Sequence, residues 1–175
     1  MRTLLLSLDC RTMAAALFYG NYKAVNLLNF SSSDEAFLSL QNGTIDILTG
    51  TTIEKSRDFE GYAFSTPYYY KSGTAKEALI AFAIATREDD SLFSSFVNCV
   101  VLAILYAEES GVNNMPFASI FGSEMRWSLR DAVSYSGSYD KLFAKHFGID
   151  SVRGRNGLNR IFEAGPQLHS LPSIT

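Results

Sequence analysis

LQNGTIDILTGTTIEKSRDFEGYAFSTPYYY, residues Leu40 to Tyr70, is the stretch that decides the fold. The apolar residues of Thr44–Leu48 predict a buried strand, and the hydroxyl-rich segment Thr49–Arg57 behind it predicts a polar loop. Tyr62–Tyr70 predicts an aromatic strand, whose last part Pro67 confines to a sheet edge. In open α/β sheets, ligands bind beyond the carboxyl ends of the strands. The loop Thr49–Arg57 is therefore the first place to look for a site.

Helices and strands are predicted to alternate on both sides of this stretch. Ala24–Phe30 and Leu79–Ala85 are short apolar runs that predict buried strands. Ser32 and Glu35 have the spacing of a capping box, which predicts a helix start. Apolar residues at helical spacing predict helices over Leu8–Phe18, Ser91–Glu109, Ser123–Ser136 and Tyr139–Phe147. This alternation predicts an α/β fold with a mostly parallel sheet and helices on both faces.

Composition places the chain among folded globular proteins. Its 175 residues are enough for one domain with a hydrophobic core, and 47% of them are hydrophobic while 19% are charged. The net charge is −3, and the Lys and Arg residues are scattered instead of forming a basic stripe. Nucleic-acid binding is therefore not expected.

The cysteines and histidines suggest no chemistry. Cys10 and Cys99 lie in apolar, helix-like stretches and are expected to be buried thiols, with a disulfide between them left open. His146 and His169 have no partner at metal-ligand spacing, so we expect no metal and no cofactor.

Two apolar stretches imitate membrane signals. Residues Met1–Leu8 resemble the opening of a signal peptide, but they are few, and Asp9 stands close to where a cleavage site should follow. The run Leu92–Ala107 is shorter than the roughly 20 residues of a bilayer span, so it is expected to be a buried helix. We therefore expect no signal peptide and no membrane span.

The loop after the predicted strand has the residue types that bind a carboxylate. Gly50 allows close approach of the backbone, and the hydroxyls of Thr49, Thr51 and Thr52 add short donors. The guanidinium of Arg57 can pair with a carboxylate through two parallel hydrogen bonds. The alternative is a solvated loop with an exposed arginine.

No catalytic arrangement is evident. The chain has no serine flanked by glycines at the spacing of a nucleophile elbow. Glu54 is a single carboxylate without a second one assigned to it. The residues therefore favour binding over catalysis.

Three segments in order resemble family 3 extracellular solute-binding proteins, the amino-acid-binding components of ABC transporters. The first runs from Gly43 and Asp46 through Thr52 and Arg57 to the aromatic strand, and it matches that strand at Phe64, Ser65, Thr66, Pro67 and Tyr68. The second is ATREDD (85–90) with the long helix behind it, and the third is GSYDKLFAKHFG (137–148). The general L-amino-acid-binding subgroup is the most similar.

The resemblance implies a periplasmic-binding-protein-like type II fold that is essentially lobe 1, with the second lobe largely missing. Residues 1–73 would form the first segment of lobe 1, and residues 74–78 the junction where the second lobe is normally inserted. Residues 79–150 would be the returning segment, and 151–175 an irregular tail. A chain of this kind is expected to be a truncated member of the family.

Carried over to this chain, the resemblance implies a ligand site on the loop. Arg57 would bind the ligand carboxylate, Thr52 would donate a hydroxyl, and the Gly50 backbone would flank the same group, with Thr51 and Thr49 as further candidates. No acidic residue can be assigned to the ligand's amino group. The implied partners are a small amino acid and a membrane permease, in the periplasm or outside the cell.

The leading hypothesis is thus a binding protein for a small amino acid in a transport system, or a remnant of one, and not an enzyme. The alternatives are a dehydratase acting on arogenate or prephenate with Glu54 as its acid, a ligand-sensing receptor domain, or a non-functional fragment. Which amino acid is bound, whether binding survives without a second lobe, and the oligomeric state stay open.

Overall fold

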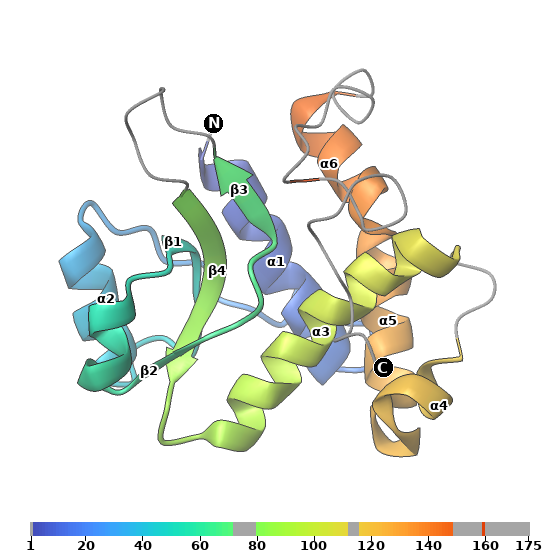
Figure 1. Ribbon diagram of the computed structural model, residues 1–175, viewed down its shortest axis with the longest axis horizontal. Coiled ribbons are helices and arrows are strands. Elements are labelled where there is room, and N and C mark those ends of the chain that lie inside the picture. The colour runs from blue at the N-terminus through green and yellow to red at the C-terminus, as the bar shows by residue number, and fades with distance from the viewer. Residues whose placement is uncertain (1, 72–79, 112–115, 149–158, 160–175) are drawn as a thin grey trace.

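A computed structural model describes residues 2–71, 80–111, 116–148 and 159 of the chain. A small sheet lies between two unequal layers of helices (Figure 1). The larger layer contains α1, α3, α5 and α6, while α2 and the short 3-10 helix η1 lie on the other side. The helices are α1 (Arg2–Leu17), α2 (Ser33–Gln41), η1 (Lys55–Glu60), α3 (Ser91–Ser110), α4 (Phe117–Phe121), η3 (Ser123–Met125), α5 (Arg126–Ser136) and α6 (Tyr139–Phe147).

The sheet is antiparallel in every pairing, so the prediction of a mostly parallel sheet in a periplasmic-binding-protein-like type II lobe is wrong. Its strands are β1 (Leu48–Thr52), β2 (Tyr62–Phe64), β3 (Tyr69–Lys71) and β4 (Ile80–Arg87). The central strand β4 pairs antiparallel with each of the other three. Ala85 of β4 pairs with both β1 and β2, and Phe82 of β4 pairs with both β1 and β3. Strand β1 therefore lies on one side of β4, and β2 and β3 both lie on the other side.

The sheet is not parallel because one predicted strand is missing: Ala24–Phe30 is predicted to be a buried strand. In the structure this segment forms no strand, and Leu27 and Leu28 are 39% and 54% exposed. A parallel sheet needs that strand beside β1 as a first partner. Without it, β1 has only the returning strand β4 to pair with, and that strand runs in the opposite direction.

Other strand boundaries shift for local reasons. The strand predicted over Thr44–Leu48 begins only at Leu48, so half of the predicted loop is in fact β1. The aromatic strand predicted over Tyr62–Tyr70 is split into β2 and β3, and Pro67 lies in the gap. A proline lacks the N–H that a continuous strand needs, which explains the interruption.

The predicted helix signals hold where the sequence is strongly periodic. The amide of Glu35 donates to the Ser32 hydroxyl at 3.1 Å, which confirms the predicted cap of α2. Helix α6 has the predicted bounds, and the predicted long helix is α3, one residue longer. Most of the predicted tail lies outside the described residues.

The two faces of β4 pack into two separate cores. Ile84 belongs to the main core against α1, α3, α5 and α6, whereas its neighbour Ala85 belongs to a small core with Phe37, Leu40 and Tyr62. This follows from the alternation of side chains along a strand. The small core lies beneath α2, and the predicted site lies on this side of the sheet.

Helix α3 is the longest helix of the described chain. The backbone amide of Phe93 donates to Asp90 Oδ1 at 2.9 Å, and this hydrogen bond caps the first turn of α3. Among the described residues, α3 alone is long and apolar enough to cross a membrane, by length and composition only. One face of it, including Val97, Val100 and Leu105, is buried in the main core, and core helices pass the same test.

Candidate functional site

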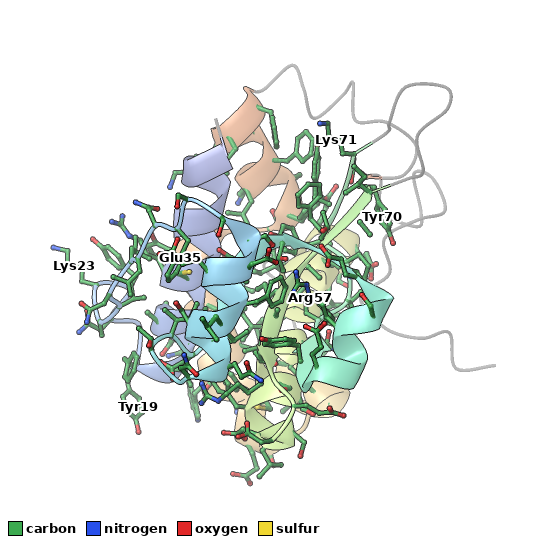
Figure 2. The ribbon with its side chains drawn as sticks, turned by 90° about the vertical axis from the view of Figure 1, so that its left-hand side faces the viewer. Tyr19, Lys23, Glu35, Arg57, Tyr70 and Lys71 are labelled. Atoms are coloured by element: carbon green, nitrogen blue, oxygen red, sulfur yellow. The ribbon has the colours of Figure 1, made fainter. Side chains whose placement is uncertain are left out.

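Arg57 is the centre of the predicted site in the structure. It lies in η1, and its guanidinium carbon is 4.0 Å from the centre of the Phe37 ring on α2. The guanidinium also contacts three carboxylates: Nη2 to Asp34 Oδ1 at 2.9 Å, Nε to Glu54 Oε2 at 2.8 Å, and Nη1 to Glu60 Oε2 at 3.4 Å. Figure 2 shows Arg57 between α2 and η1.

Thr52 reaches the same group through Glu54. The Thr52 hydroxyl donates to Glu54 Oε1 at 3.4 Å, while Glu54 Oε2 accepts from Arg57. We call Arg57, Asp34, Glu54, Glu60 and Thr52 the Arg57 cluster. The side chain of Arg57 is 15% exposed, whereas the three carboxylate side chains are 42 to 90% exposed.

The charges of the cluster keep the arginine ionised. Burial alone lowers the pKa of Arg57, but its hydrogen bonds to Asp34 and Glu54 and the charges of Glu54 and Glu60 raise it more, so the net shift is upward. The pKa of Tyr62 is also raised, by burial first and then by the charge of Glu60. One guanidinium faces three carboxylates, so the cluster carries a surplus of negative charge.

The other predicted site residues do not converge on Arg57. The Thr49 hydroxyl lies 3.8 Å from the sulfur of Cys10 on α1. The Gly50 amide donates to the Tyr68 hydroxyl at 3.0 Å, and Gly50 has φ +67° where β1 shifts register against β4. Thr51 is 8% exposed, and its hydroxyl is 3.5 Å from the Thr52 carbonyl oxygen. Of the five predicted residues, the structure therefore brings together only Arg57 and Thr52.

Sequence reasoning did not find Asp34, Glu60 and Phe37. For Glu60 a signal was present, because Glu54, Arg57 and Glu60 are spaced by three residues, which places them on one side of a helical turn. Asp34 lies on another helix, 23 residues earlier, so no local sequence pattern predicts its contact with Arg57.

Glu60 also lines an open depression in the surface of about 460 Å³. Its remaining lining comes from Gln41, Gly61, Arg87, Glu88 and Asp89. Arg87 donates through Nη1 to the carbonyl oxygens of Leu40 and Ile45 at 3.3 and 3.2 Å, so its cation is partly used by the backbone. The acidic side chains Glu60, Glu88 and Asp89 leave this depression with a negative excess.

No metal centre is evident in the part of the chain that the structure describes, where no group of three or more His, Cys, Asp or Glu side chains could hold an ion. Cys10 and Cys99 are both half-buried, and the disulfide between them that the sequence left open is not formed. Burial raises the pKa of the Cys99 thiol, which favours its protonated form.

Comparison with known proteins adds no assignment: no family model, no curated protein and no solved structure matches this chain.

Proposed function

We propose that this chain is a binding module for a small amino acid, whose α-carboxylate is held by the guanidinium of Arg57. One observation carries the proposal: Arg57 already holds a carboxylate, that of Asp34 at 2.9 Å, and the Asp34 side chain is 90% exposed. An ion pair with so exposed a partner contributes little to stability. A ligand carboxylate can therefore replace Asp34 on the guanidinium while the fold stays intact.

The cluster also supplies acceptors for the ligand's ammonium group. Glu54 and Glu60 each give one oxygen to Arg57, and their side chains are 42% and 53% exposed. An ammonium beside them would reduce the repulsion between carboxylates that share one guanidinium. A zwitterionic amino acid thus fits the charge of the cluster better than a simple carboxylate, which would add a fourth negative charge.

The depression beyond Glu60 suggests where the ligand's side chain lies. Because Glu60, Glu88 and Asp89 line it, a polar or cationic side chain is favoured over an apolar one. The described residues do not enclose the Arg57 cluster on all sides, so the ligand stays partly in water. We therefore expect weak binding, since tight small-molecule sites bury most of the ligand surface.

Thermal unfolding with each common amino acid tests the proposal. At about 10 mM, a ligand with a Kd of about 1 mM stabilises the protein by about 1.4 kcal/mol. For this chain length the midpoint then rises by roughly 3–6 °C. The same amino acid with its carboxylate amidated should give no rise, because it cannot pair with Arg57.

Matched variants separate a binding site from a structural contact. Arg57→Lys should abolish the ligand-dependent rise, since an ammonium lacks the planar fork of the guanidinium. Arg130→Lys is the control, because Arg130 also stacks on an aromatic ring but lies on α5. If no amino acid shifts the midpoint of either the wild-type protein or Asp34→Asn, the Arg57 cluster is structural only and the proposal fails.

A further inference from the structure

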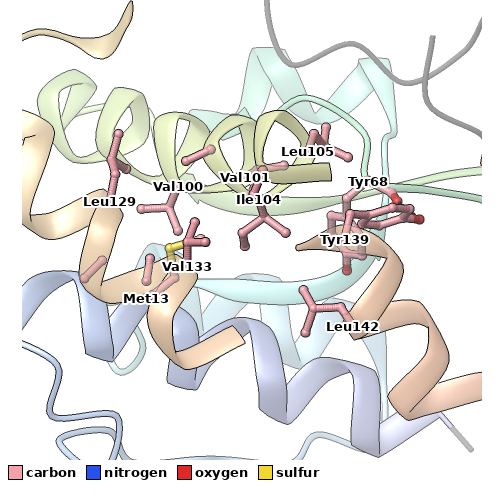
Figure 3. Packing of buried hydrophobic residues seen from close by; sticks show 14 of the residues in the cluster. Met13, Tyr68, Val100, Val101, Ile104, Leu105, Leu129, Val133, Tyr139 and Leu142 are labelled. Carbon is pink, nitrogen blue, oxygen red and sulfur yellow. Dashed lines mark hydrogen bonds between the residues drawn. The ribbon is translucent and has the colours of Figure 1, made fainter. Parts of the chain in front are cut away.

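A second candidate site lies in the main core and is independent of the Arg57 cluster. A crevice there encloses about 40 Å³ between α1, α3, α6 and the strands β3 and β4. Figure 3 shows Tyr68, Tyr139, Ile104 and Leu142 around this part of the core. Most of its lining is aliphatic or aromatic, including Met13 and Phe147.

One polar atom in this lining has no partner. Nε2 of His146, on α6, is buried and makes no hydrogen bond with protein. Buried polar atoms in native proteins are nearly always hydrogen-bonded, because an unpaired one loses its interaction with water without replacement. The Tyr139 hydroxyl, in contrast, donates to the Tyr68 carbonyl oxygen at 2.6 Å.

The imidazole of His146 is suited to a neutral partner. Burial is the main cause that lowers the pKa of His146, and the charge of Lys145 lowers it further. The ring is therefore neutral near pH 7, with one nitrogen as donor and the other as acceptor. A neutral hydroxyl can donate or accept, so it pairs with Nε2 in either tautomer.

We propose that this crevice binds a short aliphatic alcohol, with the alkyl chain among the apolar side chains and the hydroxyl hydrogen-bonded to His146 Nε2. The size of the crevice limits the ligand. One water needs about 10–15 Å³ and benzene fits a cavity of about 150 Å³, so the enclosed space takes about three to four heavy atoms and excludes an aromatic ring. With four heavy atoms, the Kd is no tighter than about 40 µM.

The test is an NMR titration of the isotopically labelled full chain with ethanol, 1-propanol and 1-butanol. We expect saturable shifts of the His146 Nε2 resonance and of the methyl groups of Ile104 and Leu142. The affinity should pass through a maximum in the series, because the enclosed volume is limited. Shifts that grow linearly with every alcohol, or that are absent at these groups, overturn the proposal.

Two variants test the hydrogen bond itself. His146→Leu should raise the Kd about 2- to 10-fold, the usual contribution of one hydrogen bond. His146→Gln retains a donor and an acceptor and should bind with nearly the wild-type Kd. Equal affinity in wild-type protein and His146→Leu would overturn the role of Nε2. The wild-type titration decides the proposal even if a variant does not fold.

Discussion

Replacing Arg57 by glutamine should destabilise the protein measurably, and the structure gives the size of the effect. The variant loses three ion pairs, with Asp34, Glu54 and Glu60, each of which contributes about 0.2–1 kcal/mol at an exposed site. The Asp34 pair lies at the low end because its carboxylate is 90% exposed. Stacking of the guanidinium on Phe37 at 4.0 Å adds about 0.5–1 kcal/mol.

The total is about 2 kcal/mol, or a fall in the unfolding midpoint of roughly 4–8 °C. Urea unfolding of wild-type protein and Arg57→Gln measures the difference in free energy. At about 1 M salt the Debye length falls to about 3 Å, so the part that comes from ion pairs should shrink. The part that comes from packing on Phe37 should persist.

Arg130→Gln is the matched control for this measurement. Arg130 also lies over an aromatic ring, with its guanidinium carbon 4.3 Å from the Trp127 centre, and it has one carboxylate partner, Asp131 at 3.3 Å. Its side chain is 54% exposed, so its loss should cost less than about 1 kcal/mol. If Arg57→Gln costs no more than Arg130→Gln, the Arg57 cluster does not hold η1 on α2 and the reasoning is refuted.

Three further predictions concern the core and its contacts. Leu105→Ala should lower the free energy of unfolding in urea by about 2–5 kcal/mol because Leu105 is fully buried, whereas Leu92→Ala on the same helix should change it by no more than about 0.5 kcal/mol because Leu92 is 84% exposed. Similar losses of stability in the two variants would contradict the packing of α3. Asn159→Ala should cost about 2 kcal/mol, since its side chain bonds both the amide and the carbonyl of Tyr70 at 2.7 Å, and an unchanged urea midpoint would argue against that contact. Because burial lowers the pKa of His146 below its unfolded value of about 6.5, its contribution to stability is complete above that pH and is lost as pH falls through and below it. Urea midpoints measured across this range should fall less steeply in His146→Gln, and parallel pH profiles would contradict the assignment.

Local signals in the sequence predict the elements whose causes are local. The cap at Ser32 depends on a hydroxyl and an amide three residues apart, and the structure forms that bond. Strand β4 and helix α3 depend on continuous apolar residues and helical periodicity, and both form close to their predicted bounds. Such features need no knowledge of the remainder of the chain.

The partners of these elements depend on distant residues, and here the prediction failed. An apolar run such as Ala24–Phe30 has the composition of a buried strand, but burial requires a neighbour to cover it, and in the structure most of this run is exposed. Whether the sheet is parallel or antiparallel depends on which strand pairs with β1. That strand is β4, which lies about 30 residues later along the chain. Periodicity identifies a strand and its faces, but it contains no information about its partner.

The candidate site, like the fold, is predicted from the sequence only in part. Arg57 and Thr52 were predicted from their chemistry, and the structure links them through Glu54. Thr49 and Gly50 were predicted from the same stretch, but alternation along β1 and the change of register turn them towards Cys10 and Tyr68. A stretch of donors in sequence becomes a site only if the backbone directs those donors to one side.

Asp34→Asn distinguishes a binding site from a structural contact at Arg57. In the wild-type protein, Asp34 occupies Nη2 of Arg57 as an intramolecular competitor of any ligand carboxylate. Groups held together in one chain compete at an effective concentration of order millimolar, so a ligand must be present at similar concentrations to displace Asp34. Removing the charge of Asp34 frees the guanidinium and should lower the Kd for an amino acid about tenfold, measured by calorimetric titration. If Arg57 serves only to join η1 to α2, the same substitution slightly weakens the fold and creates no affinity for any amino acid.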